Sequence, residues 1–175
     1  LCSGNETDII LTVNPEPRGV NSLESPVCSD DGFSFNPQTK ISNLLTSTFT
    51  WTASYPAGLT GGAASGSGPV TGTLNNVTDG VLNATYTITP VSTVGSCTGN
   101  AFTITVPIRP EPVGMADANT VCSDVAVNYN LINNVAVLGN NVGSTFSWIA
   151  ANHPNVGGES LTAQSGGIIT NVVNK

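Results

Sequence analysis

The sequence predicts an all-β protein that is built from tandem two-sheet sandwich repeats. Three observations lead to this prediction. The chain repeats itself at an interval of about 95 residues. Apolar and polar residues alternate along short segments, as they do in strands with one buried face. Only 9% of the residues are charged, and Thr, Ser, Asn and Gly take most of the polar positions, a composition typical of short strands joined by turns.

The repeat shows most clearly in two pairs of stretches. Residues 1–17 (LCSGNETDIILTVNPEP) align without gaps with residues 96–112 (SCTGNAFTITVPIRPEP) at an offset of 95. The stretch VCSDDGFSFN, which begins at Val27, matches VCSDVAVNYN, which begins at Val121, at an offset of 94. The small difference between the offsets indicates a single period with short insertions in loops.

A third pair places tryptophan at corresponding positions. STFTW ends at Trp51 and STFSW ends at Trp148, at an offset of 97. We therefore expect the last strand of a preceding repeat in residues 1–17, a complete repeat in residues 18–112, and a following repeat in residues 113–175 that stops before its final two strands.

Alternation predicts the strands of the complete repeat in chain order. The segments are GFSFN (32–36), STFTWTA (47–53), PVTGTL (69–74), NATYTIT (83–89) and AFTITVPI (101–108). The Gly-rich residues 57–68 and the Asp79-Gly80 pair predict turns, and no segment has a sustained helical period. About seven short strands in a repeat of this length are typical of an immunoglobulin-like sandwich.

The inward positions of these strands predict the cores. We expect the complete repeat to bury several large side chains, and the following repeat to bury the two aromatic residues at corresponding positions. The predicted core residues are Phe49, Trp51, Tyr86 and Ile104 in the complete repeat, and Phe146 and Trp148 in the following one.

Charge and hydropathy exclude two classes of partner. The chain has 4 basic and 11 acidic residues and a net charge of −7, which repels nucleic-acid phosphates and anionic lipid headgroups. No apolar run approaches the roughly 20 residues that a membrane-spanning helix requires. We therefore expect neither nucleic-acid binding nor insertion into a membrane.

The four cysteines predict disulfides formed in an oxidising compartment, because they include no C-x-x-C pair that would suit zinc. Pairing Cys97 with Cys122 is disfavoured, since the strand after Cys97 carries the chain about 40 Å away before Cys122 is reached. We expect Cys28, at the start of the first strand, to bond Cys97, before the last strand, because both strands begin at one end of a seven-strand sandwich. Cys2 and Cys122 would then pair with cysteines outside this segment.

No catalytic residue is predicted, because there is no G-x-S-x-G motif and the single histidine, His153, would have to serve every base role. We also expect no cofactor. Calcium at the junctions is the alternative, with carboxylates as its ligands, and solvated carboxylates without a metal explain the same residues. The residues concerned are Glu16, Glu111, Asp30 and Asp31.

The order of these motifs resembles a known family. VCSD, FTWTA, GGAASGSG, ATYTITP, SCTG and FTITVPIRPEP are similar to the PKD-like repeat that occurs in tandem in very large surface proteins of Bacteroidota. The resemblance implies an immunoglobulin-like fold and a place in an extended stalk. Proteins of this kind include gliding-motility adhesins that the type IX secretion system exports.

Two functions follow as expectations. The first is a non-enzymatic stalk or adhesive segment of a secreted, extracellular adhesin on the bacterial cell surface. Its partners would be the neighbouring repeats of the same polypeptide and either a surface polysaccharide or the secretion and gliding machinery. The second is a carbohydrate-binding accessory module of a secreted polysaccharide-degrading enzyme. That function requires an exposed aromatic platform, for which Tyr55, next to Pro56, is the candidate.

Overall fold

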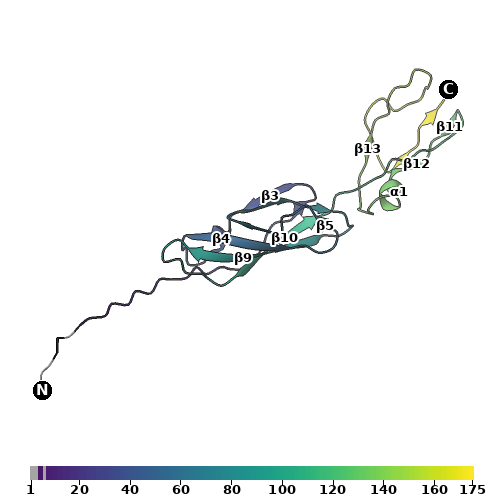
Figure 1. Cartoon of the computed structure of the whole chain (residues 1–175). Helices are drawn as coiled ribbons and strands as arrows, with labels where there is room; N and C mark the ends of the chain where they lie inside the picture. The colour runs from purple at the N-terminus through teal and green to yellow at the C-terminus, as the bar shows by residue number, and fades with distance from the viewer. Residues whose placement is uncertain (1–3, 6) are drawn as a thin grey trace.

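The computed structural model describes residues 4–5 and 7–175, and it confirms the all-β prediction. Figure 1 shows three parts in a row: an extended N-terminal segment, a sandwich formed by the complete repeat, and a smaller C-terminal unit. The extended segment leaves the sandwich at the end opposite to the C-terminal unit. Cys2, for which a disulfide partner outside this segment was predicted, lies outside the described residues.

The larger sheet of the sandwich has six strands. Its path runs β1 (Ser22–Leu23), β10 (Phe102–Arg109), β9 (Leu82–Ser92), β4 (Ser47–Ser54) and β6 (Ser65–Ser67), and β2 (Val27–Cys28) also pairs with β10. The β9, β4 and β6 pairings are antiparallel, whereas β1 and β2 run parallel to β10.

Two short antiparallel ladders complete the sandwich. One joins β3 (Gly32–Phe35) to β7 (Val70–Thr73), and the other joins β5 (Leu59–Thr60) to β8 (Asn75–Asn76). A 3-10 helix, η1 (Pro37–Lys40), follows β3, and the Asn36 side chain caps it by accepting the Gln38 N–H. These elements close the apolar face of the larger sheet.

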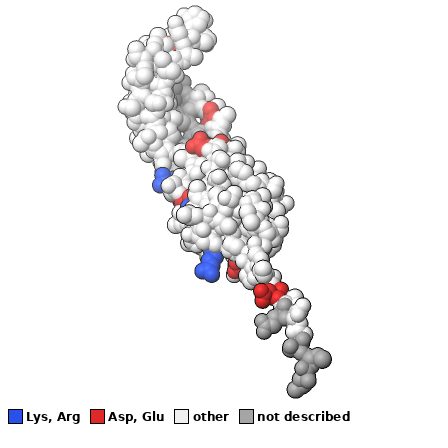
Figure 2. All heavy atoms as spheres, turned by 90° about the vertical axis from the view of Figure 1, so that its left-hand side faces the viewer, with Lys and Arg blue, Asp and Glu red and all other residues white. Residues whose placement is uncertain are grey.

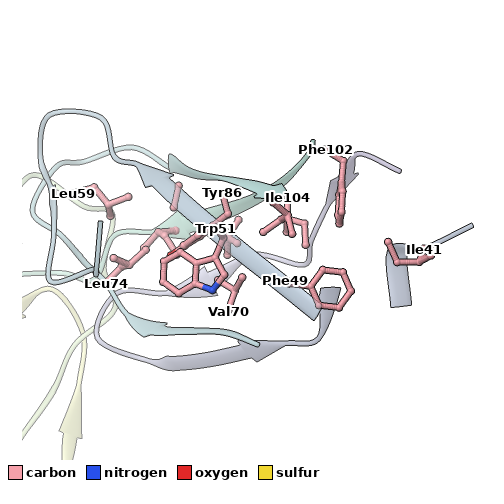
Figure 3. Packing of buried hydrophobic residues seen from close by; sticks show 13 residues of the cluster. Ile41, Phe49, Trp51, Leu59, Val70, Leu74, Tyr86, Phe102 and Ile104 are labelled. Atoms are coloured by element: carbon pink, nitrogen blue, oxygen red, sulfur yellow. The ribbon is translucent and has the colours of Figure 1, made fainter. Parts of the chain in front are cut away.

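The core is organised around Tyr86, which is 1% exposed. Its ring makes edge-to-face contacts with Phe33, Phe35, Trp51 and Tyr55, with ring centroids 5.6–6.3 Å apart. Figure 3 shows Trp51, Tyr86 and Ile104 converging between the two layers. The buried hydrophobic residues of this core lie between Ile41 and Ile108, and Val27, Phe33 and Phe35 pack against them, so the complete repeat holds a core of its own.

Predicted core residues of the two repeats differ in burial. Phe49, Trp51, Tyr86 and Ile104 are buried, whereas Phe146 and Trp148 are half-buried. The C-terminal unit has only short ladders: β11 (Val125–Ala126) with β16 (Val172–Val173), β12 (Tyr129–Asn130) with β15 (Ile168–Ile169), and β13 (Ser147–Trp148) with β14 (Gln164–Ser165). In the complete repeat, Trp51 lies on β4, which pairs with β9 over its whole length, whereas each of these ladders in the C-terminal unit has two residue pairs.

One helix departs from the expected pattern. Alpha helix α1 (Leu131–Ala136) occupies the position that corresponds to η1, and the Asn130 side chain caps it by accepting the Ile132 N–H. Asn130 corresponds to Asn36 at an offset of 94. A helix of this length has too few turns for a periodic apolar pattern, so only the cap signals it.

The predicted disulfide between Cys28 and Cys97 is contradicted by the structure, in which both are free cysteines. Because β2 runs parallel to β10, Cys28 ends its strand beside Arg109, at the far end of β10. Cys97 lies before Phe102, at the near end. The length of β10 separates them, about 25 Å at the rise of an extended strand, whereas a disulfide requires Cα atoms within about 7 Å.

Replacing the central aromatic side chain tests the importance of this core. We expect Tyr86→Ala to lower the free energy of unfolding of the complete repeat by about 3–5 kcal/mol, because it leaves a cavity among four rings. Urea unfolding followed by tryptophan fluorescence measures the change. Tyr86→Phe is the matched control and should cost less than about 1 kcal/mol, since it removes only the 3.4 Å contact with the Tyr55 hydroxyl. Equal losses in the two variants would contradict a packing role.

Candidate functional site: the junctions between repeats

The short linkers before each unit are held by an asparagine side chain. Before the complete repeat, Asn43 Oδ1 accepts the Arg18 N–H at 3.1 Å, and Asn43 Nδ2 donates to the Glu16 carbonyl at 2.9 Å. One amide therefore bridges Pro17, which is fully buried. This fixes the direction in which the chain enters the sandwich.

The next junction repeats this arrangement. Asn140 Oδ1 accepts the Val113 N–H at 2.9 Å, and Asn140 Nδ2 donates to the Glu111 carbonyl at 2.7 Å. Asn140 Nδ2 also lies 3.3 Å from the carbonyl oxygen of Thr78, in the loop between β8 and β9. This contact links the C-terminal unit directly to the complete repeat.

These asparagine clamps, defined as Asn43 and Asn140 with the linker groups they bind, were not predicted from the sequence. The signal was present, because Asn43 and Asn140 share the offset of 97 that relates the two tryptophans. The residues after them, Leu44 and Asn141, both have positive φ, at 57° and 59°. The same turn therefore presents the amide in both units.

An acidic group lies at the second junction. The Glu111 carboxyl is close to Asp30 and Asp31, and the hydrogen bond to Asp30 and repulsion between like charges raise the pKa of Glu111 above its ordinary value. Asp30 in turn accepts the Asn75 side-chain amide at 2.8 Å. Three of the four residues proposed for calcium are thus neighbours, while Glu16 lies at the first junction.

Calcium binding by this acidic group stays a prediction. Among the described residues, no group of three or more His, Cys, Asp or Glu side chains has an arrangement that could hold a metal ion.

Charged side chains are sparse in Figure 2, where most of the visible surface is uncharged. One surface ion pair, Lys40 Nζ to Glu24 at 2.8 Å, lowers the pKa of Glu24.

Tyr55 does not present the flat exposed face that a sugar platform needs. Its ring packs edge-on against Tyr86, and its hydroxyl donates to the Ala63 carbonyl at 2.7 Å. The side chain is half-buried and belongs to the margin of the core. Its position in the loop next to Pro56 suggested exposure, because the sequence does not show that the Gly-rich segment folds back over it.

Comparison with known proteins identifies both units. A family model described as a PKD-like domain matches residues 25–112 and residues 119–175. No match was found among curated proteins or among solved structures. Domains of this family are typical of extracellular repeat or adhesive modules and are generally non-catalytic. Within the described residues, no helix is long and apolar enough to cross a membrane.

The asparagine clamps can be tested separately by amide hydrogen exchange in the full chain. Asn140→Ala should accelerate exchange of the Val113 amide about tenfold, because the N–H loses its acceptor. Asn43→Ala should do the same for the Arg18 amide. Each variant is the control for the other, and NMR measures both amides at once. Unchanged exchange at Val113 in the Asn140 variant would contradict the second clamp.

The acidic group predicts a pH dependence. Because the pKa of Glu111 is higher in the folded chain than in the unfolded chain, its proton favours the folded state. The stabilisation is present below the ordinary carboxyl pKa and is lost as pH rises through the raised value. NMR titration of the Glu111 carboxyl should show a lower midpoint in Asp30→Asn than in the unaltered chain. An unshifted midpoint would show that Asp30 is not the cause.

Proposed function

The chain belongs to the PKD-like domain family, and on that premise we propose that it is part of a stalk of tandem repeats in a large secreted adhesin on a bacterial cell surface. In this function the repeats act as spacers and bear load. They hold a binding domain away from the cell and need no active site of their own. The neighbouring repeats are the partners of each unit.

The repeated asparagine clamp is the observation that carries this proposal. A spacer requires each domain to meet the next one in a defined direction, and Asn43 and Asn140 form the same pair of hydrogen bonds at successive linkers. Proline on both sides of Glu16 and of Glu111 restricts the same linkers further. Domains joined by flexible linkers would need neither feature.

The sparse charge of the surface also suits an extended array. The chain has 9% charged residues and a net charge of −7. Successive repeats therefore carry few charged groups that would attract one another and bend the array, or that would bind polyanions. The sequence resemblance extends the proposal to gliding-motility adhesins of Bacteroidota that are exported by the type IX secretion system. Surface polysaccharide or the gliding machinery would then meet other parts of the polymer.

Small-angle X-ray scattering of the full chain tests the stalk. A compact protein of this length has a radius of gyration of about 16 Å, and we expect a clearly larger value with an extended tail in the distance distribution. Pro110→Gly/Pro112→Gly is the flexible reference, because glycine frees the backbone at the second linker. A compact distribution, or one that the double variant leaves unchanged, would contradict a stiff stalk.

A further inference from the structure

We propose that Cys28 forms a disulfide with the Cys97-type thiol of the next repeat, so that consecutive repeats are joined by a covalent bridge as well as by the polypeptide. Cys97 would correspondingly bond the Cys28-type thiol of the preceding repeat. The proposal rests on the proposed function, because it requires repeats in tandem.

The first step is the position of Cys28. It pairs with Arg109 at the end of β10, where the chain leaves the sandwich, and it is exposed. The Ser29 N–H donates to the Arg109 carbonyl at 2.8 Å. The Arg109 carbonyl oxygen therefore points toward the strand that carries Cys28.

The second step is the position of Cys97. Its thiol lies 3.7 Å from the carbonyl oxygen of Asn14, in the segment that enters the sandwich. The loop that carries Cys97 packs directly on this segment. Gly95 in this loop lies so close to Asn14 that an added Cβ would collide with the Asn14 side chain. The Cys97 amide donates to the Ser92 hydroxyl at 2.9 Å, which holds the loop in place.

The third step uses the repeat to relate the position of a Cys28-type residue to that of Cys97. Asn14 corresponds to Arg109 at the offset of 95. A preceding repeat that pairs with Asn14 as this repeat pairs with Arg109 places its Cys28-type residue beside Asn14. It also directs the Asn14 carbonyl toward that residue's strand. The Cys97 thiol contacts the same Asn14 carbonyl oxygen. This arrangement would therefore place both thiols next to one carbonyl group.

Burial along the entering segment supports this placement. Ile9, Leu11 and Val13 are 82–92% exposed, but they correspond to Ile104, Val106 and Ile108 of β10, which are fully buried. The segment thus has the pattern of a β10-type strand, whose sheet neighbours would include a β2-type strand. Beside Cys97 and Asn14 lies an open groove of about 470 Å³ that the end of such a strand could enter.

The bridge accounts for all four cysteines with one rule. Cys2 corresponds to Cys97, and Cys122 corresponds to Cys28. Each Cys28-type thiol then pairs forward and each Cys97-type thiol pairs backward along the array. No two cysteines of this chain are partners under that rule, in agreement with the free thiols of Cys28, Cys97 and Cys122.

The chemistry requires an external disulfide as oxidant, such as oxidised glutathione. One thiolate attacks a glutathione sulfur, breaks the glutathione S–S bond and releases one reduced glutathione. The second thiolate then attacks the mixed disulfide and releases the other. Two cysteine thiols lose two electrons and two protons, and one oxidised glutathione becomes two reduced molecules.

A two-repeat chain tests the proposal: residues 7–112 followed directly by a second copy of residues 18–112. The join restores the natural Pro-Arg sequence of the first linker. After incubation with oxidised and reduced glutathione, peptide mapping should find Cys28 of the first copy bonded to Cys97 of the second. Cys97 of the first copy and Cys28 of the second should have no protein partner.

Two serine variants make the result specific. Cys97→Ser in the second copy should abolish the bridge, whereas Cys97→Ser in the first copy should leave it intact. A bond within one copy, or no bond between copies while thermal unfolding shows both copies folded, would overturn the proposal. Scattering of the same chain under reducing conditions reports the stalk separately, so an extended chain without the bridge would leave the proposed function standing.

Discussion

The pairing of β10 on both of its sides is the constraint on which the rest of the structure depends. It binds β9 in antiparallel register and β1 and β2 in parallel register. Ile104, Val106 and Ile108 are consequently buried completely. A strand held on both edges can move neither sideways nor along its register without losing a whole row of hydrogen bonds and its buried face.

This pairing also connects the core to the junctions. β10 crosses the sandwich from the Cys97 loop to Arg109, so the strand that closes the core also carries the chain to the next unit. Force applied along the chain is therefore applied to β10, whose parallel partners β1 and β2 belong to the beginning of the same repeat. The first and last parts of the repeat are coupled directly, without the intervening loops.

The junctions achieve a defined geometry with neutral groups. Each asparagine clamp satisfies one linker N–H and one linker carbonyl, groups that would otherwise face water without a fixed direction. Neutral hydrogen bonds are little affected by salt, whereas an exposed ion pair would be screened. This is consistent with a surface on which polar amides and hydroxyls, rather than charges, predominate.

The sequence predicted the period, the all-β class, the longer strands β3, β4, β7, β9 and β10, and the large side chains at the centre of the core. These features depend on local alternation and on repetition, both of which can be read directly. The sequence predicted turns in residues 57–68, which instead contain the short strands β5 and β6. Trp148 and Phe146, for which the sequence predicted burial, are only half-buried.

Which strands are neighbours, and in which direction they run, depends on contacts between distant parts of the chain and was seen only in the folded structure. Alternation specifies the buried face of a strand, but it is the same whether the partner is parallel or antiparallel. The parallel pairing of β2 with β10 placed Cys28 at the end of the repeat opposite to Cys97. Likewise, the packing of the half-buried Tyr55 ring and the clamp formed by Asn43 depend on loops folding back, and these contacts between distant residues leave no local pattern.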